Sequence, residues 1–174
     1  MLESRLLGLF NEKLHQRTTM HGVLVKKAIR GILIIGDSGS GKTASAMKLI
    51  ERGYRWVADD VIQIERKDPE KLHGSGHGLT GRLIEIKGRG IVDSRSVFDS
   101  ASLCSEAVID LVISLSRKTE RDGINSRHRM GKAFIEILGI RLPKYTLRSS
   151  RSIDETVDRI DSIVSRHGCS GGLP

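Results

Sequence analysis

The chain has 174 residues, with 29 lysines and arginines against 21 aspartates and glutamates and a formal net charge of +8 at pH 7. This length predicts one domain with a sizeable core and excludes a multi-domain machine. The hydrophobic fraction of 38% indicates a globular rather than a disordered chain. Aromatic residues make up only 3%, which argues against binding of single-stranded nucleic acid by base stacking. The basic surplus alone predicts an anionic partner and no more.

The first residues and the cysteines bear on localisation. Apolar residues between Leu2 and Phe10 would share one helical face, so residues 1–16 are expected to form an N-terminal helix. Charges interrupt this cluster, which is too short and too polar for a signal peptide or a membrane span. Cys104 and Cys169 have no metal-ligand spacing and do not suggest a disulfide-stapled secreted domain. We therefore expect a cytoplasmic protein.

The next elements read as strand, loop and helix. β-Branched runs at residues 23–29 and 32–35 predict two strands, and the pair Arg30-Gly31 between them suits a tight hairpin turn. A glycine-rich loop follows the second strand. Good helix formers over residues 43–52 then predict a helix that stops at Gly53.

The rest of the chain is rich in short strands, predicted at residues 55–58, 61–65, 83–86, 107–115, 134–137 and 145–147. Several glycines make residues 66–82 a predicted mobile loop. Amphipathic residues 152–167 predict a C-terminal helix that begins with a capping box of Ser152 and Glu155. Many strands and few helices predict an α/β fold, a mixed β-sheet domain with flanking helices.

The strongest chemical signal is the run GDSGSGKT, which fits the phosphate-binding loop (P-loop) pattern G-x-x-x-x-G-K-[ST] between a predicted strand and a predicted helix. Such a loop turns backbone N–H groups toward phosphate oxygens. Lys42 would neutralise the β- and γ-phosphates of a nucleotide, and Thr43 would offer its hydroxyl to Mg²⁺. The predicted ATP-binding residues are Gly36, Asp37, Ser38, Gly39, Ser40, Gly41, Lys42 and Thr43.

The pair Asp59-Asp60 follows the apolar Trp56-Val57 one helix after Lys42. This order places a carboxylate at a strand end near the phosphates, where it would hold Mg²⁺ directly or through water. Neighbouring strand residues point to opposite faces, so only one of the two is expected to reach the γ-phosphate unless the strand breaks there. A solvated turn between two short strands is the alternative interpretation.

Other polar residues are uninformative by themselves. A histidine placed as His21 is, before the first strand, is typical of a surface or capping position, and Glu85 alternates with isoleucines as a solvent-facing strand residue does. His73 and His77 are four residues apart, but the glycines around them argue against a helix and a zinc site. An arginine near the phosphates is expected if phosphoryl transfer is the chemistry.

Taken in order, four separated motifs resemble the catalytic domain of the HPr serine kinase/phosphorylase family, in its short form without an additional N-terminal domain. The motifs are RTTMHGVLV from Arg17, GDSGSGKT from Gly36, ERGYRWVADD from Glu51 and IEIKGRGIVD from Ile84. The similarity is much weaker beyond Ala101. Several motifs in the right order are far more specific than one P-loop. The resemblance implies the mixed α/β fold of the HPr kinase and phosphoenolpyruvate carboxykinase type.

The resemblance implies an ATP- and Mg²⁺-dependent bacterial enzyme that phosphorylates a serine of HPr, a phosphocarrier of the phosphotransferase system that regulates carbohydrate metabolism. The same enzyme would remove that phosphate by transfer to inorganic phosphate, and it would assemble as a homohexamer. Asp60 falls on the family's general base, His21 on its catalytic-site histidine and Lys42 on its P-loop lysine. Thr43 and Glu85 fall on metal-associated positions, and Asp59 is a further metal candidate. Neither nucleic acid nor a membrane is expected as a partner.

Three places depart from the family pattern. Ala44 stands where the family has Glu after the GK[ST] triplet, which removes a carboxylate near the metal or nucleotide. The family's tyrosine-aspartate-arginine-leucine-glycine stretch is represented only loosely by residues 127–131, which assigns the catalytic arginine to Arg129. Residues 148–151 replace a proline- and glycine-containing segment associated with phosphorylase activity, so a kinase with weak or lost phosphorylase activity is one reading.

Two other functions fit the same residues. A P-loop kinase or carboxykinase for a small metabolite would use Lys42, Thr43 and the paired carboxylates in the same way. A non-catalytic ATP-binding regulatory module would bind ATP without turnover, and Ala44 and the short length favour that reading.

Overall fold

The computed structural model describes residues 16–78, 80–86, 88–116, 131–149 and 152–169. The strands of its main sheet are β1 (Arg17–Lys27), β2 (Arg30–Gly36), β3 (Arg55–Asp68), β4 (Lys71–Gly76), β7 (Glu106–Ser116), β8 (Gly131–Ile137) and β9 (Ile140–Arg148). Their order is β2-β1-β3-β4-β7-β9-β8. A separate hairpin consists of β5 (Leu83–Ile86) and β6 (Gly90–Asp93). The helices are α2 (Lys42–Glu51) and α3 (Ile153–Cys169).

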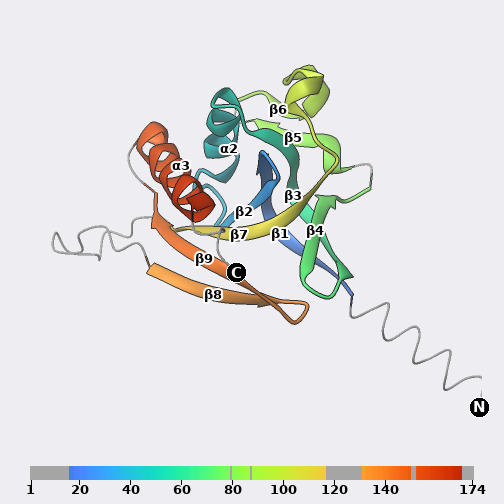
Figure 1. Cartoon of the computed structure of the whole chain (residues 1–174). Coiled ribbons are helices and arrows are strands. Elements are labelled where there is room, and N and C mark those ends of the chain that lie inside the picture. The colour runs from blue at the N-terminus through green and yellow to red at the C-terminus, as the bar shows by residue number, and fades with distance from the viewer. Residues whose placement is uncertain (1–15, 79, 87, 117–130, 150–151, 170–174) are drawn as a thin grey trace, which may run out of the picture.

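Both helices cover the same face of the sheet (Figure 1). Alternation along β2 shows how the sequence builds two cores, because successive strand residues point to opposite faces. Ile32 and Ile34 pack with residues of α2 and α3, whereas Leu33 packs into a second cluster on the opposite face. Ile84 of β5 joins the first cluster, so the β5–β6 hairpin extends the core beside α2. The predicted mixed α/β fold is confirmed.

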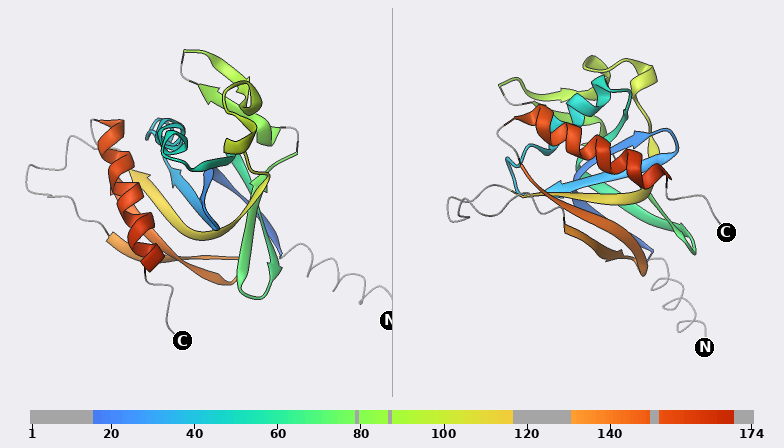
Figure 2. Two further views of the ribbon diagram at one scale, coloured as in Figure 1. Left: turned by 45° about the horizontal axis from the view of Figure 1, so that its top comes forward. Right: turned by 60° about the vertical axis from the view of Figure 1, so that its left-hand side comes forward.

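The sheet curls back on itself (Figure 2) because β2 also pairs with β7. The five strands β2, β1, β3, β4 and β7 therefore form a closed ring, in which each strand pairs with the next and β7 pairs with β2. β7 is parallel to both β2 and β9. In this register Gly36 lies opposite Leu115, and Leu115 lies opposite Leu147. Three parallel strands therefore end level at one edge, which is where open α/β sheets bind ligands.

The predicted hairpin turn at Arg30-Gly31 is wrong by two residues. Lys27 pairs with Arg30, and Ala28 takes the left-handed conformation of the turn with φ 53°. Gly31 lies instead inside β2, where a Cβ atom would be 2.3 Å from the Val108 carbonyl oxygen. This glycine permits the close approach of β7 and does not mark the turn.

The predicted mobile loop over residues 66–82 is also wrong for most of its length, because β3 continues to Asp68 and β4 follows it. Three of the glycines that suggested a loop, Gly74, Gly76 and Gly81, mark close packing instead. A Cβ atom on Gly74 would lie 2.5 Å from Leu24 Cδ2. The predicted helices at 43–52 and 152–167 are confirmed as α2 and α3. The strand predicted at 83–86 is confirmed as β5 with the same bounds, and those at 107–115, 134–137 and 145–147 are confirmed with longer bounds as β7, β8 and β9. The predicted helix over residues 1–16 lies outside the described residues, apart from Gln16.

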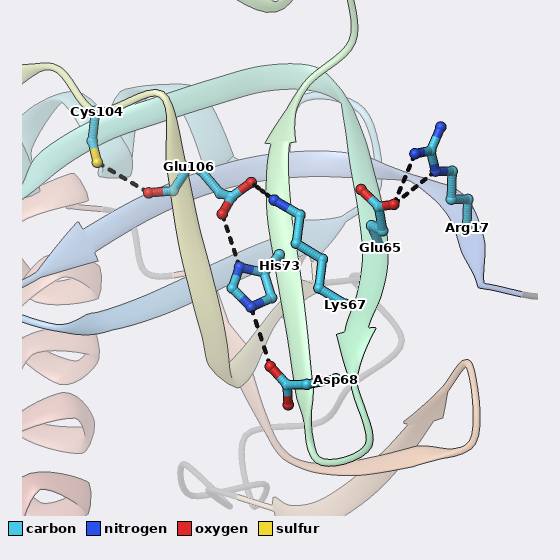
Figure 3. Close-up of polar contacts among 7 residues, drawn as sticks. All are labelled: Arg17, Glu65, Lys67, Asp68, His73, Cys104 and Glu106. Carbon is cyan, nitrogen blue, oxygen red and sulfur yellow. Dashed lines mark hydrogen bonds and ion pairs between the residues drawn. The ribbon is translucent and has the colours of Figure 1, made fainter.

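A polar cluster attaches the end of β3 and β4 to β7 (Figure 3). His73 Nδ1 lies 2.8 Å from Glu106 Oε1, and its Nε2 lies 3.7 Å from Asp68 Oδ2. Lys67 also pairs with Glu106, and the Cys104 thiol donates a hydrogen bond of 3.0 Å to the Glu106 carbonyl oxygen. Lys67, and then His73, lower the pKa of Glu106 below its usual value. None of the helices described here has the length and hydropathy to cross a membrane.

Candidate active site

The run GDSGSGKT forms the connection between β2 and α2, as the P-loop motif requires. Gly41 directly precedes the helix with φ 91°, a conformation that suits a residue without a Cβ atom. Lys42 is buried, and its Nζ donates hydrogen bonds to the carbonyl oxygens of Gly36 (2.9 Å) and Asp37 (3.0 Å). The ammonium group therefore lies against the first two residues of the loop, where it would neutralise the charge of a bound phosphate.

Thr43 and Asp59 meet at the start of α2. The Thr43 hydroxyl donates to Asp59, 3.2 Å from Oδ2 and 3.4 Å from Oδ1, and the Asp60 N–H donates to Asp59 Oδ1 at 2.9 Å. Asp59 is only 6% exposed. Burial raises the pKa of its carboxyl group, and the hydrogen bonds from Asp60 and Thr43 oppose that rise. The structure thus brings together two of the predicted metal-binding residues.

These two oxygen ligands fit Mg²⁺, which typically takes one or two carboxylates and completes its coordination with substrate phosphates and water. Within the described part of the chain, no group of three or more His, Cys, Asp or Glu side chains is placed to hold a metal ion. A site made of Thr43, Asp59 and nucleotide phosphates needs no such group. Glu85, on β5, is exposed and makes no hydrogen bond or ion pair with Thr43 or Asp59.

Asp60 pairs with His21, whose Nδ1 lies 2.9 Å from Asp60 Oδ1. Both side chains are open to solvent, with exposures of 58% for His21 and 75% for Asp60. His21 lies two residues before Val23, which packs in the core beneath α2, so His21 is on the same face of the sheet as α2. Val23 pairs with Ile34 and with Asp59, which aligns the two aspartates with the end of β2.

The backbone at Asp60 explains how both carboxylates contact site residues. β3 is continuous through this point, so the alternative of a solvated turn between two short strands is wrong. Asp60 takes a left-handed conformation with φ 71°, which interrupts the strict alternation of strand side chains. Asp59 consequently meets Thr43 while Asp60 meets His21. Which of the two carboxylates reaches the γ-phosphate stays a prediction.

Gly22 is a site residue to which sequence reasoning assigned no role. It pairs with Asp60 across β1 and β3, and a Cβ atom on it would lie 2.5 Å from the Ile34 carbonyl oxygen. Only a glycine allows β2 to approach β1 this closely where the two aspartates lie. Its position directly after His21 in the first motif was the available signal. Arg129 lies outside the described residues.

Comparison with known proteins shows to which family the chain belongs. Residues 12–167 match the family model described as HPr Serine kinase C-terminal domain. The chain belongs to this family. It is 38% identical over 144 residues to HPr kinase/phosphorylase of Thermoanaerobacter sp. (strain X514), covering 83% of this chain and 47% of that protein. It is 33% identical over 150 residues to HPr kinase/phosphorylase of Streptococcus salivarius, covering 85% and 48%.

This HPr serine kinase C-terminal domain therefore spans about half the length of these curated relatives. A solved structure titled as the Hpr(Ser) kinase/phosphatase from Coxiella burnetii matches it with a TM-score of 0.73 and 28% sequence identity. That match covers 88% of this chain and 97% of the Coxiella chain. The fold described above is therefore the fold of a solved member with this title.

Proposed function

We propose that residues 1–174 form a single catalytic domain of an ATP-dependent protein serine kinase that phosphorylates HPr, and that the same site removes the phosphate with inorganic phosphate. The observation that carries this proposal is the exposed Asp60–His21 pair, which the strand register places at the end of β2 where the P-loop begins. A base open to solvent suits an acceptor serine carried by a protein better than a small metabolite in a closed pocket. The printed names of the relatives, HPr kinase/phosphorylase, support HPr as that protein.

Each site residue has a role in this reaction. ATP, the phosphoryl donor, binds the loop from Gly36 to Thr43 and is neutralised by Lys42. Asp60 accepts the proton of the serine hydroxyl while the serine oxygen forms its bond to the γ-phosphorus and the bond from that phosphorus to ADP breaks. His21 holds the Asp60 carboxylate in place, and Arg129 is assigned to the charge on the transferred group.

Mg²⁺, when bound, would offset negative charge on the phosphates, held by Thr43 and Asp59, with Glu85 as a second candidate. In the reverse direction an oxygen of inorganic phosphate attacks the phosphorus of phosphoserine. Asp60 then returns its proton to the leaving serine oxygen, and pyrophosphate is the other product. The chain has Arg148-Ser149-Ser150-Arg151 in place of the segment associated with phosphorylase activity, so the reverse reaction is expected to be the weaker one.

The family resemblance also supports a homohexamer in the cytoplasm, with HPr and inorganic phosphate as partners and no role for nucleic acid. Within such an assembly the net charge of +8 would favour phosphorylated, anionic partners, although only weakly at physiological salt.

One assay tests the proposal. The protein is incubated with HPr, ATP and Mg²⁺, and HPr is analysed by mass spectrometry for phosphoserine, with HPr lacking its acceptor serine as the control. Phosphorylated HPr is then incubated with inorganic phosphate, and pyrophosphate is measured. ATP binding without any phosphoserine would favour a regulatory module. ATP turnover that depends on a small metabolite instead of HPr would favour the metabolite kinase or carboxykinase.

A further inference from the structure

The P-loop receives a hydrogen bond from the far end of the chain. The Ser149 hydroxyl donates to the Ser40 carbonyl oxygen at 2.7 Å, across 109 residues of sequence. Ser149 lies between β9 and α3, outside the P-loop motif. Its own backbone N–H donates to the Ser116 carbonyl oxygen at 2.9 Å. The end of β7 therefore anchors the residue whose side chain contacts the loop.

The parallel strands bring these residues together. β2, β7 and β9 end level, so the chain that leaves β9 passes beside the loop that leaves β2. The start of α3 also lies near the loop, because a Cβ atom built on Gly41 would be 3.4 Å from Ile153 Cδ1. The junction between β9 and α3 thus contacts the loop at Ser40 and lies close to it at Gly41.

The contact at Ser40 controls the direction of a neighbouring donor. A peptide unit is planar and trans, so the Ser40 carbonyl and the Gly41 N–H point in opposite directions. Holding that carbonyl toward Ser149 directs the Gly41 N–H away from Ser149. The Ser40 N–H is already used, since it donates to the Asp37 carbonyl oxygen at 3.1 Å, whereas no residue in the described ranges accepts the Gly41 N–H.

This peptide unit needs an anchor because it adjoins a glycine. Gly41 has φ 91°, and a residue without a Cβ atom rotates about its backbone bonds at little cost. In a P-loop the backbone N–H groups must face the phosphates before the nucleotide arrives, or binding must supply the energy to order them. The Ser149 hydroxyl provides that order from outside the motif.

We propose that Ser149 is a positioning residue of the P-loop, which holds the Ser40–Gly41 peptide so that the Gly41 N–H faces the nucleotide phosphate. The inference rests on the proposed function only in requiring that this loop binds ATP. It assigns a task to Ser149, one residue of the segment in which the chain departs from the family pattern.

The test compares ATP binding, measured by calorimetry with Mg²⁺ present, for four variants. Ser149→Ala should weaken binding about 3- to 10-fold, the range for the loss of one hydrogen bond. Ser149→Cys, which keeps the size but donates weakly, should fall between wild type and Ser149→Ala, and Ser149→Thr should restore binding. Ser116→Ala is the matched control, because the Ser116 hydroxyl donates to the Leu147 carbonyl oxygen at 3.5 Å at the same sheet edge but does not touch the loop.

Steady-state kinetics with HPr separate positioning from general loosening. Ser149→Ala should raise the KM for ATP and change kcat by less than about twofold. Unchanged ATP binding in Ser149→Ala, an equal loss in Ser116→Ala, or failure of Ser149→Thr to restore binding would overturn the inference. If Ser149→Ala does not fold, wild-type binding by Ser149→Cys overturns it. A wild-type protein that binds ATP but leaves HPr unphosphorylated refutes the proposed function and leaves this binding test intact.

Discussion

Two histidine–carboxylate pairs among the described residues have nearly equal lengths but lie in very different settings. His21 and Asp60 are 2.9 Å apart and open to solvent, and Asp60 has φ 71°. His73 and Glu106 are 2.8 Å apart, with exposures of only 19% and 38%, and Glu106 pairs regularly with Ser75 across β4 and β7. Lys67 also bonds to Glu106, and Asp68 lies near the other ring nitrogen (Figure 3).

The difference shows that the pair by itself does not identify an active site. The pair at His73 shares its charges among neighbours and joins two strands, as a structural cluster does. The pair at His21 leaves an exposed carboxylate beside the P-loop on a strained backbone, and strain of this kind costs of order 1 kcal/mol and is found mainly at functional sites. We therefore expect substitutions at the first pair to affect activity and those at the second to affect stability.

Asp60→Asn should have the largest effect. Asparagine keeps the shape of the side chain and tolerates positive φ, so the fold and ATP binding should be unchanged. Loss of the general base should lower HPr phosphorylation by about 10²- to 10⁴-fold. Mass spectrometry of HPr, calorimetry with ATP and thermal unfolding measure the three quantities. A rate near that of wild type would exclude Asp60 as the base.

His21→Ala and His73→Ala should separate the two pairs. His21→Ala frees the Asp60 carboxylate and should lower the phosphorylation rate up to about 100-fold, while stability changes by less than about 1 kcal/mol because the pair is exposed. His73→Ala should lower the free energy of unfolding by about 1 kcal/mol and leave the rate of the folded protein unchanged. Urea unfolding and initial rates measure both variants, and the reverse pattern would contradict this comparison.

Asp59→Asn should raise stability while it lowers activity. Burial raises the pKa of Asp59, so the folded protein binds this proton more tightly than the unfolded chain does. Stability consequently falls as the pH rises from the unfolded to the folded pKa, and the penalty is complete above the folded pKa. Asparagine removes this charge penalty, so the free energy of unfolding should rise by about 0.5–2 kcal/mol at pH 7. The rate of HPr phosphorylation should fall at least about 10-fold, because a metal-binding carboxylate is lost. Loss of stability at pH 7 in urea unfolding would contradict the burial argument.

Glu106→Gln should have the smallest effect, confined to acidic pH. Lys67 first, and then His73, lower the pKa of Glu106. The stabilisation that ionised Glu106 gives the fold is therefore complete above the ordinary pKa of glutamate. It is lost as the pH falls through the lowered pKa of Glu106 in the folded protein. In the Gln variant, thermal stability should depend less steeply on pH in that acidic range, with phosphorylation rates at neutral pH unchanged. An unaltered acid dependence would mean that Glu106 does not stabilise the β4–β7 contact.

Local patterns in the sequence correctly predicted those elements whose signal lies within a short run of consecutive residues. The run from Gly36 to Thr43 lies between a strand and a helix as expected, and the amphipathic spacing of residues 152–167 corresponds to α3. Glycines elsewhere in the chain led to wrong predictions of secondary structure. Gly31 and Gly74 suggested a turn and a loop, but each permits a close contact with residues distant in the chain. A sequence window does not show which of these tasks a glycine performs.

By itself, the sequence determined the strand–loop–helix around the P-loop, because propensity and motif act within a few residues, and it indicated the family through four motifs in order. Only the tertiary structure decided which side chains meet: Asp59 with Thr43, Asp60 with His21, and Ser149 with Ser40. These contacts depend on sheet register and on a left-handed residue inside β3. Both arise from pairing between distant strands, for which no local preference of the chain provides a signal.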